Sequence, residues 1–365
     1  MLVTSIINSV TRILISSESD PISTNLVNPS QNKSVKSGIL TLRHMCTEDS
    51  MQATYELVQN HGIPAYGRFA ENCNGRIICG EKNSRVGHTA GGLFDVPSAV
   101  AHREGLERTK NVYQFENNRF TQIKPLNWKI FDPSAVYFPP NIVNDVSVLI
   151  ILSGWGDENR ELSKQMEYLI MDDSFSCNDW RMCLDCVPVK LDSHQTNNFQ
   201  KKLILTGGEI SGAGMEWEEW LKTYKEWDKK SESNAWEGSI SFEPELRVKW
   251  NPLPPMRVQR CDHIAVVIGD KLFCIGGQKT KSTEYYSFAT NSWQQGPELP
   301  FTIYGATGVV NALLGQCFIV GGCIVVDDRG GIHSSKVYLF DPQKGLIDVK
   351  GEFDIGGMNN IAVLL

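Results

Sequence analysis

The cysteines around residue 183 have the residue types of a zinc site. Cys183 and Cys186 form a Cys-x-x-Cys pair, with Cys177 before it and His194 after it. Zinc ribbons and zinc fingers need a second pair of ligands at a characteristic distance. The sequence has no second Cys-x-x-Cys that could complete four thiolates. We therefore interpret these cysteines as loop or strand residues and predict no metal site.

The remaining polar groups offer no pattern of catalytic residues. Asp172-Asp173 and Asp327-Asp328 are typical of solvated turns. Four histidines stand at separate positions with no associated nucleophile, which favours polar loop or strand residues: His88, His102, His263 and His333. We predict no catalytic residue and no cofactor.

Composition narrows the classes of partner. The 365 residues carry a formal net charge of −7, and no cluster of Lys and Arg is longer than a pair. This charge excludes nucleic acid as an expected partner. No apolar run has the length of a membrane span, so we expect no membrane partner. Most of the ten cysteines lack paired spacing, which favours reduced thiols and a cytoplasmic location.

Two copies of one pattern occupy residues 250–340 and must position any binding or chemical group. In each copy an apolar strand ends in Gly-Gly and an aromatic strand follows. The first copy contains Leu272–Ile275, Gly276, Gly277, Tyr286 and Trp293. The second contains Cys317–Val320, Gly321, Gly322 and Tyr338, with Gly345 at the position of the Trp. A repeat of strands without helical periodicity predicts radially arranged four-stranded sheets.

These residues resemble the blade motif of the kelch family of β-propellers. A strand buried on both faces needs a continuous apolar run, and glycines suit the tight turn after it. Aromatic side chains at one fixed place in each repeat fill the space between neighbouring sheets. The resemblance implies that the structural residues of the blades are Gly207, Gly208, Gly276, Gly277, Tyr286, Trp293, Gly321, Gly322 and Tyr338.

Weaker copies extend the repeat toward the N-terminus. The second glycines of the copies are Gly92, Gly154, Gly208, Gly277 and Gly322, which gives five legible blades. The strand at 361–365 matches the start of a further blade. Because a propeller must hide its first and last strand edges, we expect this strand to pair near Arg76 to Leu93. The fold class is an all-β kelch-type propeller of five or six four-stranded blades.

Three regions are predicted along the chain. Residues 1–40 are rich in Ser, Asn, Thr and Pro toward their end, which predicts a disordered tail. Residues 41–65 contain a short helix over 48–60, capped by Thr47, with Met51, Tyr55 and Val58 on one face. Residues 66–365 form the propeller, with an insertion at 211–238. The BTB domain of ubiquitin-ligase adaptors is not expected before the propeller.

The resemblance implies a protein-interaction module that acts as a scaffold or adaptor. In kelch modules the connections between blades line one mouth of the ring, where Arg residues often bind acidic peptides. Arg257 and Arg260 match such a connection, and Tyr304 lies on the next; planar guanidinium groups pair well with carboxylates. The alternative for both arginines is a solvated turn. An acidic peptide and a cytoskeletal protein are the candidate partners.

Two kelch-fold enzyme classes remain the alternative function. They are copper radical oxidases similar to galactose oxidase and sialic acid mutarotases. The oxidase needs a Cys–Tyr crosslink, and nothing in the spacing selects Cys79 with Tyr113 or Tyr137. The mutarotase needs a sugar pocket that no motif locates. We therefore favour binding, although a shared fold is weak support for a function.

The insertion at 211–238 has an aromatic periodicity of its own. Aromatic residues recur at helical spacing at Trp217, Trp220, Tyr224 and Trp227. A helix of this length is marginal alone, so its aromatic face must be buried. One alternative is a brace that packs on the propeller; the other is a docking segment, since Trp and Tyr anchors dominate interface energies.

Overall fold

The computed structural model describes most of the chain from residue 110 onward and several strands before it. The described residues are 10–18, 35–44, 51–59, 70–73, 76–80, 110–116, 119–128, 130–131, 133–143, 146–156, 162–171, 179–209, 231–242, 245–312, 315–325, 331–334, 336–348 and 361–364. Every regular element in these ranges is a β-strand, and all the pairings are antiparallel. This confirms the predicted all-β class.

The first three sheets come from the N-terminal half of the chain and the C-terminal strand. The first sheet has the order β28 (Ile361–Leu364), β1 (Val10–Glu18), β2 (Val35–His44) and β3 (Met51–Gln59). The second has β4 (Ala70–Cys73), β5 (Arg76–Gly80), β6 (Val112–Glu116) and β7 (Arg119–Ile123). The third has β9 (Ser134–Val143), β10 (Val146–Gly156), β11 (Leu162–Met171) and β12 (Arg181–Met182), with β8 (Ile130–Phe131) also paired to β10.

The next three large sheets follow the order of the chain. The fourth has β13 (Gln195–Phe199), β14 (Lys202–Thr206), β15 (Ala235–Phe242) and β16 (Leu246–Pro252). The fifth has β17 (Ile264–Ile268), β18 (Lys271–Ile275), β19 (Thr283–Ser287) and β20 (Ser292–Gln295). The sixth has β22 (Thr307–Asn311), β23 (Gln316–Val320), β26 (Val337–Asp341) and β27 (Gly345–Asp348). A small seventh sheet has β21 (Thr302–Tyr304), β24 (Cys323–Val325) and β25 (Gly331–His333).

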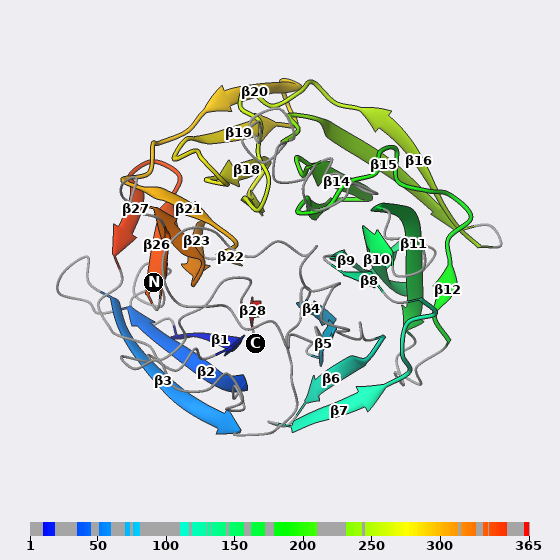
Figure 1. The fold of residues 1–365 in the computed structure, drawn as a ribbon, viewed down its shortest axis with the longest axis horizontal. Coiled ribbons are helices and arrows are strands. Elements are labelled where there is room, and N and C mark those ends of the chain that lie inside the picture. The colour runs from blue at the N-terminus through cyan, green and yellow to red at the C-terminus, as the bar shows by residue number, and fades with distance from the viewer. Residues whose placement is uncertain are drawn as a thin grey trace, which may run out of the picture.

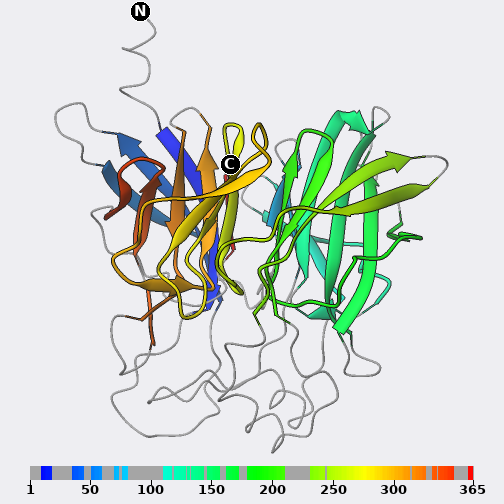
Figure 2. The same cartoon turned by 90° about the horizontal axis from the view of Figure 1, so that it is seen from above.

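The large sheets surround a common centre in a propeller-like arrangement (Figure 1). Their innermost strands contact one another in a closed circle: β28, β4, β9, β13, β17, β22 and again β28. Seen edge-on, the strands run between the two faces of the ring (Figure 2). The connections between strands therefore gather at these two faces.

Burial on both faces explains the apolar second strand of each sheet. Leu203, Ile204 and Leu205 in β14 have no exposed surface, and the same holds for residues 317–320 in β23. Each such strand lies between two neighbouring sheets, so both of its faces need apolar side chains. Burying a single Leu or Ile contributes about 1.5–3 kcal/mol. The core therefore consists of layers between neighbouring sheets.

The C-terminal strand completes the first sheet together with N-terminal strands. In the pairing of β28 with β1, Val363 lies opposite Leu14 and Ala362 opposite Ile15. Pairing of the C-terminal strand with an N-terminal segment agrees with the sequence prediction. The partner strand differs from the prediction. The sequence predicted pairing near Arg76, in β5, whereas the observed partner is β1. The reason is that residues 10–59 supply three strands that were not recognised.

The N-terminal region corrects two sequence predictions. Where residues 1–40 were predicted to be a disordered tail, the chain forms β1 and the start of β2. Where a helix was predicted over 48–60, the chain forms β3. The β3 sequence alternates apolar Met51, Ala53, Tyr55 and Leu57 with polar residues for most of its length, which is the period of a strand. Some of these apolar residues also fit one face of a helix. The helix prediction was wrong because the two-residue repeat of a strand was taken for the repeat of a helix.

The predicted helical insertion lies mostly outside the described residues. Trp217, Trp220, Tyr224 and Trp227 all fall within 210–230, which the structure does not describe. The last part of the predicted insertion, 231–238, is described and forms a short bridge and then the start of β15. No helix in the described part of the chain has the length and hydropathy needed to cross a membrane.

Candidate functional site

The Gly-Gly doublets of the sequence motif end the second strands of three sheets. Gly207 and Gly208 follow β14, Gly276 and Gly277 follow β18, and Gly321 and Gly322 follow β23. All six have positive φ angles, from 57° at Gly207 to 118° at Gly277. Side chains rarely adopt this backbone conformation, and glycine adopts it without steric cost. The doublets therefore turn the chain sharply where each second strand ends.

The doublets of the fourth and fifth sheets pack against the connection that enters the next sheet. A Cβ atom on Gly276 would lie 2.5 Å from the carbonyl oxygen of Ile303, and one on Gly207 would overlap the carbonyl oxygen of Arg260. The second glycine donates its N–H to the same carbonyl groups, from Gly208 to Arg260 at 2.8 Å and from Gly277 to Ile303 at 2.9 Å. Adjacent sheets are thus joined by backbone contacts that only glycine permits.

One face of the ring carries both kinds of connection. In an antiparallel sheet with sequential strands, the second-to-third connection and the connection to the next sheet lie at the same end. We call this end the doublet face, because it holds the three Gly-Gly pairs. The turns of the opposite face include Gly269-Asp270, between β17 and β18.

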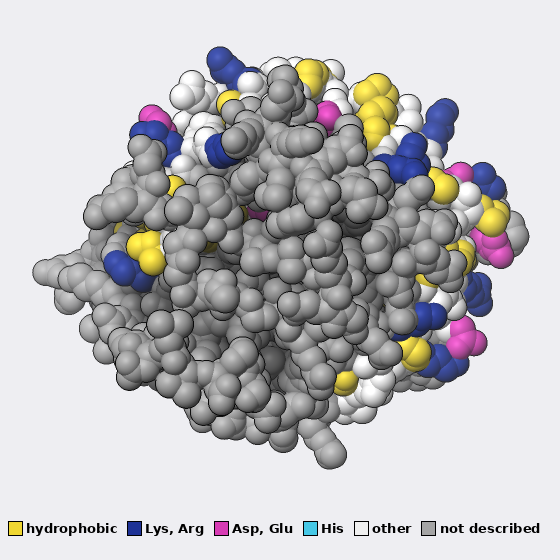
Figure 3. Space-filling view, viewed as in Figure 1, with side chains coloured by type: hydrophobic (Ala, Val, Ile, Leu, Met, Phe, Trp, Pro, Cys, Tyr) yellow, Lys and Arg dark blue, Asp and Glu magenta, His cyan; other side chains and the backbone are white. Residues whose placement is uncertain are grey.

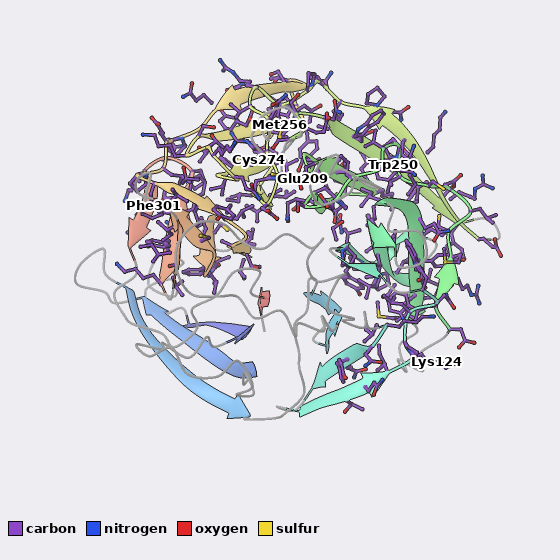
Figure 4. All side chains as sticks on the ribbon, viewed as in Figure 1. Lys124, Glu209, Trp250, Met256, Cys274 and Phe301 are labelled. Atoms are coloured by element: carbon purple, nitrogen blue, oxygen red, sulfur yellow. The ribbon has the colours of Figure 1, made fainter. Side chains whose placement is uncertain are left out.

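The two residues that flank the insertion after β14, Glu209 and Ser231, both lie at the doublet face. Glu209 forms a backbone bridge with Ser231 and another with Asp192, and Glu232 forms one with Arg260. The N–H of Glu232 donates to Gly208 at 2.8 Å, and the N–H of Arg260 donates to Glu232 at 3.1 Å. Glu209 lies on the inner side of the fourth sheet (Figure 4). The two ends of residues 210–230 are therefore held in a stem fixed to the neighbouring sheet.

Arg260, predicted to contact a partner, is completely buried. Its side chain has 0% exposed surface. The Nε and Nη2 atoms each donate to Glu284 Oε1 at 3.1 Å. Nη1 donates to the carbonyl oxygens of Gly276 at 2.6 Å and Ser282 at 2.8 Å, and Nη2 donates to Ser282 Oγ at 2.7 Å. This geometry leaves Arg260 no surface for a partner and corrects the prediction.

Glu284 explains why Arg260 is inside. Its carboxylate, 2% exposed, also accepts the backbone N–H of Arg257 at 2.8 Å and of Val258 at 3.3 Å. The hydrogen bonds of Arg260 and Glu284 together hold the connection from β16 to β17 against the fifth sheet. The sequence signal for this pair was an acidic residue within a strand, two residues before the motif Tyr286.

The other predicted contact residues remain at the surface or near it. The Arg257 side chain is exposed, on the connection from β16 to β17. Tyr304 is half-buried at the end of β21, where it pairs with Cys323. Both therefore lie on connections into adjacent sheets, on either side of the fifth sheet. In the space-filling view, Lys and Arg side chains of the described residues are spread around the rim and form no single patch (Figure 3).

The motif aromatics occupy the outer part of the core. Tyr286 and Trp293 lie opposite each other in β19 and β20, with ring centroids 5.3 Å apart. Trp293 Nε1 donates to the carbonyl oxygen of Pro254 at 2.7 Å, which ties the fifth sheet to the preceding connection. In the sixth sheet Phe340, opposite Cys317, holds the place that Tyr286, opposite Leu272, holds in the fifth. Tyr338, predicted to be the motif Tyr of this sheet, lies two residues earlier and packs against Phe301 with ring centroids 5.4 Å apart. These aromatics fill the space between sheets, as the sequence pattern predicts.

Two buried histidines join neighbouring sheets. His194 and His263 immediately precede the innermost strands β13 and β17. The Nε2 atom of His194 hydrogen-bonds Ser134 Oγ in the third sheet at 2.8 Å, and that of His263 hydrogen-bonds Thr206 Oγ1 in the fourth at 3.1 Å. Burial lowers the pKa of His194 to about 4 and, with nearby Arg260 and His194 adding to it, that of His263 to about 3. Both rings are neutral at pH 7.

The candidate zinc residues are held by other contacts. Cys183 Sγ donates a hydrogen bond to the carbonyl oxygen of Leu246 at 3.3 Å, while His194 bonds Ser134. Within the described ranges, no group of three or more His, Cys, Asp or Glu side chains could hold a metal ion. Cys177, His88 and His102 lie outside the described residues, as does the His333 side chain.

Comparison with known proteins identifies one repeat. Residues 259–300 match the family model described as the Kelch motif. The match includes the whole fifth sheet, with the Arg260–Glu284 pair, the doublet Gly276-Gly277 and the aromatics Tyr286 and Trp293. No curated protein matches the chain. The match shows that residues 259–300 form a kelch repeat within the propeller-like ring.

Proposed function

We propose that this chain is a six-bladed kelch propeller that binds another protein at its doublet face as a cytoplasmic scaffold or adaptor. The closed circle of innermost strands supports six blades. The Kelch motif supports an interaction role, which is common among such propellers. The six cysteines with described side chains form no disulfide, which supports a reducing compartment.

The observation that carries this proposal is the rigid anchoring of the doublet face. The glycine doublets, Arg260 and Glu284 fix the connections into the fourth, fifth and sixth sheets. The stem at Glu209 and Ser231 fixes the ends of a long insertion at the same face. Binding residues are commonly found on loops that a rigid scaffold positions. The opposite face has short turns such as Gly269-Asp270.

The side chains at the doublet face that could contact a partner indicate the chemistry of that partner. Arg260 is neutralised by Glu284, so an acidic peptide would be bound by Arg257, with Tyr304 beside the next connection. The insertion adds the aromatic stripe Trp217, Trp220, Tyr224 and Trp227, which we propose as the anchors of the interface. A cytoskeletal protein with an exposed acidic segment would satisfy both features.

Replacing the insertion tests this function. Residues 211–229 are exchanged for a short Gly-Ser linker in the full chain, which leaves the stem residues Glu209 and Ser231 intact. We expect cosedimentation with actin filaments, or capture of specific proteins from a cytoplasmic extract, to be lost. Asp270→Lys, on the opposite face, is the matched control and should bind as the wild type does. Equal binding by the wild type and the linker variant would contradict the proposal.

The enzyme alternatives predict a different measurement. A copper radical oxidase holds one tightly bound copper ion, whereas the proposed binding module holds none. Elemental analysis of the purified full chain distinguishes the two. Copper in a one-to-one ratio with the chain would favour the oxidase. Binding of a sialic acid sugar in calorimetry would favour the mutarotase.

A further inference from the structure

The bend at residues 183–186 connects the third sheet to the outer edge of the fourth. It follows β12, the outermost strand of the third sheet, and packs on the first residues of β16. In the fourth sheet, β16 pairs with β15 and has no other strand partner among the described residues. The bend therefore occupies the place where a further strand would pair with β16.

Three contacts hold the bend on this edge. Asp185 accepts two hydrogen bonds from Arg247, from Nε at 2.9 Å and from Nη2 at 3.0 Å. It also accepts the backbone N–H of Val248 at 2.7 Å. Cys183 Sγ donates to the carbonyl oxygen of Leu246 at 3.3 Å. The side chains of the bend thus satisfy polar groups of an edge strand, which would otherwise be open to pairing with another chain.

The two cysteines of the bend differ in exposure. Cys183 is 8% exposed, whereas Cys186 is exposed, and Leu184 between them is 63% exposed. Both cysteines are free thiols. Burial raises the pKa of Cys183 to about 11, and charges on Asp185 and Cys186 add to the rise. The backbone N–H of Cys183 donates to Met166 and that of Val187 to Lys164, two residues away on β11, and the chain bends at Leu184-Asp185 between them, so the bend folds Cys186 back toward Cys183.

We propose that Cys183 and Cys186 are a reversible redox modification site, and that a disulfide between them releases the edge of β16. The proposal does not depend on the function proposed above. It also gives a role to the only Cys-x-x-Cys sequence in the chain. Disulfides need Cα atoms within about 7 Å of each other, and residues 183 and 187 are anchored to positions of β11 only two residues apart, about 7 Å along a strand.

The oxidant is hydrogen peroxide. Exposed Cys186 loses its proton and its sulfur attacks one peroxide oxygen; the O–O bond breaks, and the departing hydroxide takes up that proton, so a sulfenic acid and water form. The Cys183 sulfur then attacks the sulfenic sulfur, the S–S bond forms, and a second water leaves. Two thiols lose two hydrogens and two electrons, and the peroxide is reduced to two water molecules. A dithiol reductant returns both protons and both electrons.

Oxidation removes part of the bend's hold on β16. A disulfide sulfur carries no proton, so the hydrogen bond from Cys183 to Leu246 is lost. The new covalent ring also changes the bend that carries Asp185, so the bonds to Arg247 and Val248 weaken. The Val248 N–H and the Leu246 carbonyl then become exposed to water, as at an open strand edge.

Mass spectrometry and hydrogen exchange test both parts of the proposal. The full chain is treated with hydrogen peroxide, one sample is then reduced with dithiothreitol, and both are digested. We expect the peptide with both cysteines to lose two hydrogens, and dithiothreitol to restore them. Exchange of the Val248 amide should rise about fivefold, as expected for the loss of one hydrogen bond. Asp185→Asn should raise Val248 exchange without oxidant.

Cys186→Ser is the matched control, because this site is exposed and the change should not disturb folding. Its Val248 exchange should not respond to peroxide. The proposal is overturned if peroxide leaves Cys183 reduced, or if Cys186 pairs with a different thiol. An internal disulfide with unchanged Val248 exchange would overturn the release of β16.

Discussion

At the scale of single residues, the buried pair of Arg260 and Glu284 carries the largest predicted effect. Arg260→Ala leaves a carboxylate with 2% exposure without its guanidinium partner. We expect a loss of about 3–5 kcal/mol in the free energy of unfolding, measured by urea denaturation. Arg257→Ala, an exposed neighbour, should change it by less than about 0.5 kcal/mol. Similar values for both variants would show that Arg260 is not buried as described.

The lowered pKa values of two buried histidines predict how the stability of the fold depends on pH. The pKa values of His194 and His263 lie below the ordinary value of 6.5, at about 4 and about 3. The unfolded chain therefore binds more protons than the folded chain between these values and 6.5. Stability is fully present above pH 6.5 and falls as the pH decreases below it, by up to about 1.4 kcal/mol per pH unit for each ring.

A variant separates the histidines from other titrating groups. Glu167 and Glu232 have pKa values raised by burial and titrate in part of the same range. The comparison is therefore between the wild type and His263→Gln, with unfolding followed in urea at pH 7 and pH 5. We expect the variant to lose less stability than the wild type over this interval. An equal loss would show that His263 is not buried and neutral in the folded chain.

At the scale of elements, the glycine doublets can be tested against a glycine in open space. Gly276 and Gly269 have nearly equal φ angles, +62° and +64°. A Cβ on Gly276 would lie 2.5 Å from the Ile303 carbonyl oxygen, while one on Gly269 would meet no atom within 4 Å. Alanine at a positive φ angle destabilises the folded chain by about 1–2 kcal/mol, and this loss applies to both variants.

Gly276→Ala should lose clearly more stability than Gly269→Ala, and the difference reports the contact between sheets. Thermal unfolding of both full-length variants measures it. Equal losses would mean that the doublet is a turn without a role in joining the fifth sheet to the next connection.

The elements that were predictable from the sequence are those with a repeated and buried pattern. Residues 272–275 and 317–320 are apolar throughout and followed by Gly-Gly, so their strands and turns could be read directly. β3 could not be predicted as a strand, because some of its apolar residues fit the repeat of a strand and also that of a helix. Arg260 was read as exposed because its partner Glu284 is 24 residues away in the chain and only folding brings them together.

At the scale of the whole molecule, closure of the ring depends on the C-terminal strand. In β28, Val363 pairs with Leu14 of β1. Val363→Pro removes a backbone donor and disfavours a strand. We expect a lower melting temperature and self-association in size-exclusion chromatography, because the edge of β1 becomes open. Val363→Thr keeps the backbone donor, so it should elute as the wild type does and lower the melting temperature less. Equal behaviour of the two variants would contradict closure by β28.

The central claim is that a partner docks on the doublet face, and site-specific photo-crosslinking tests it most directly. The photoreactive residue p-benzoylphenylalanine replaces Tyr304 on that face or, in a second full-length variant, Asp270 on the opposite face. Both are irradiated in a cytoplasmic extract, and the adducts are identified by mass spectrometry. The account predicts a specific protein adduct at position 304 and none at position 270. An adduct at position 270, with none at 304, would contradict it.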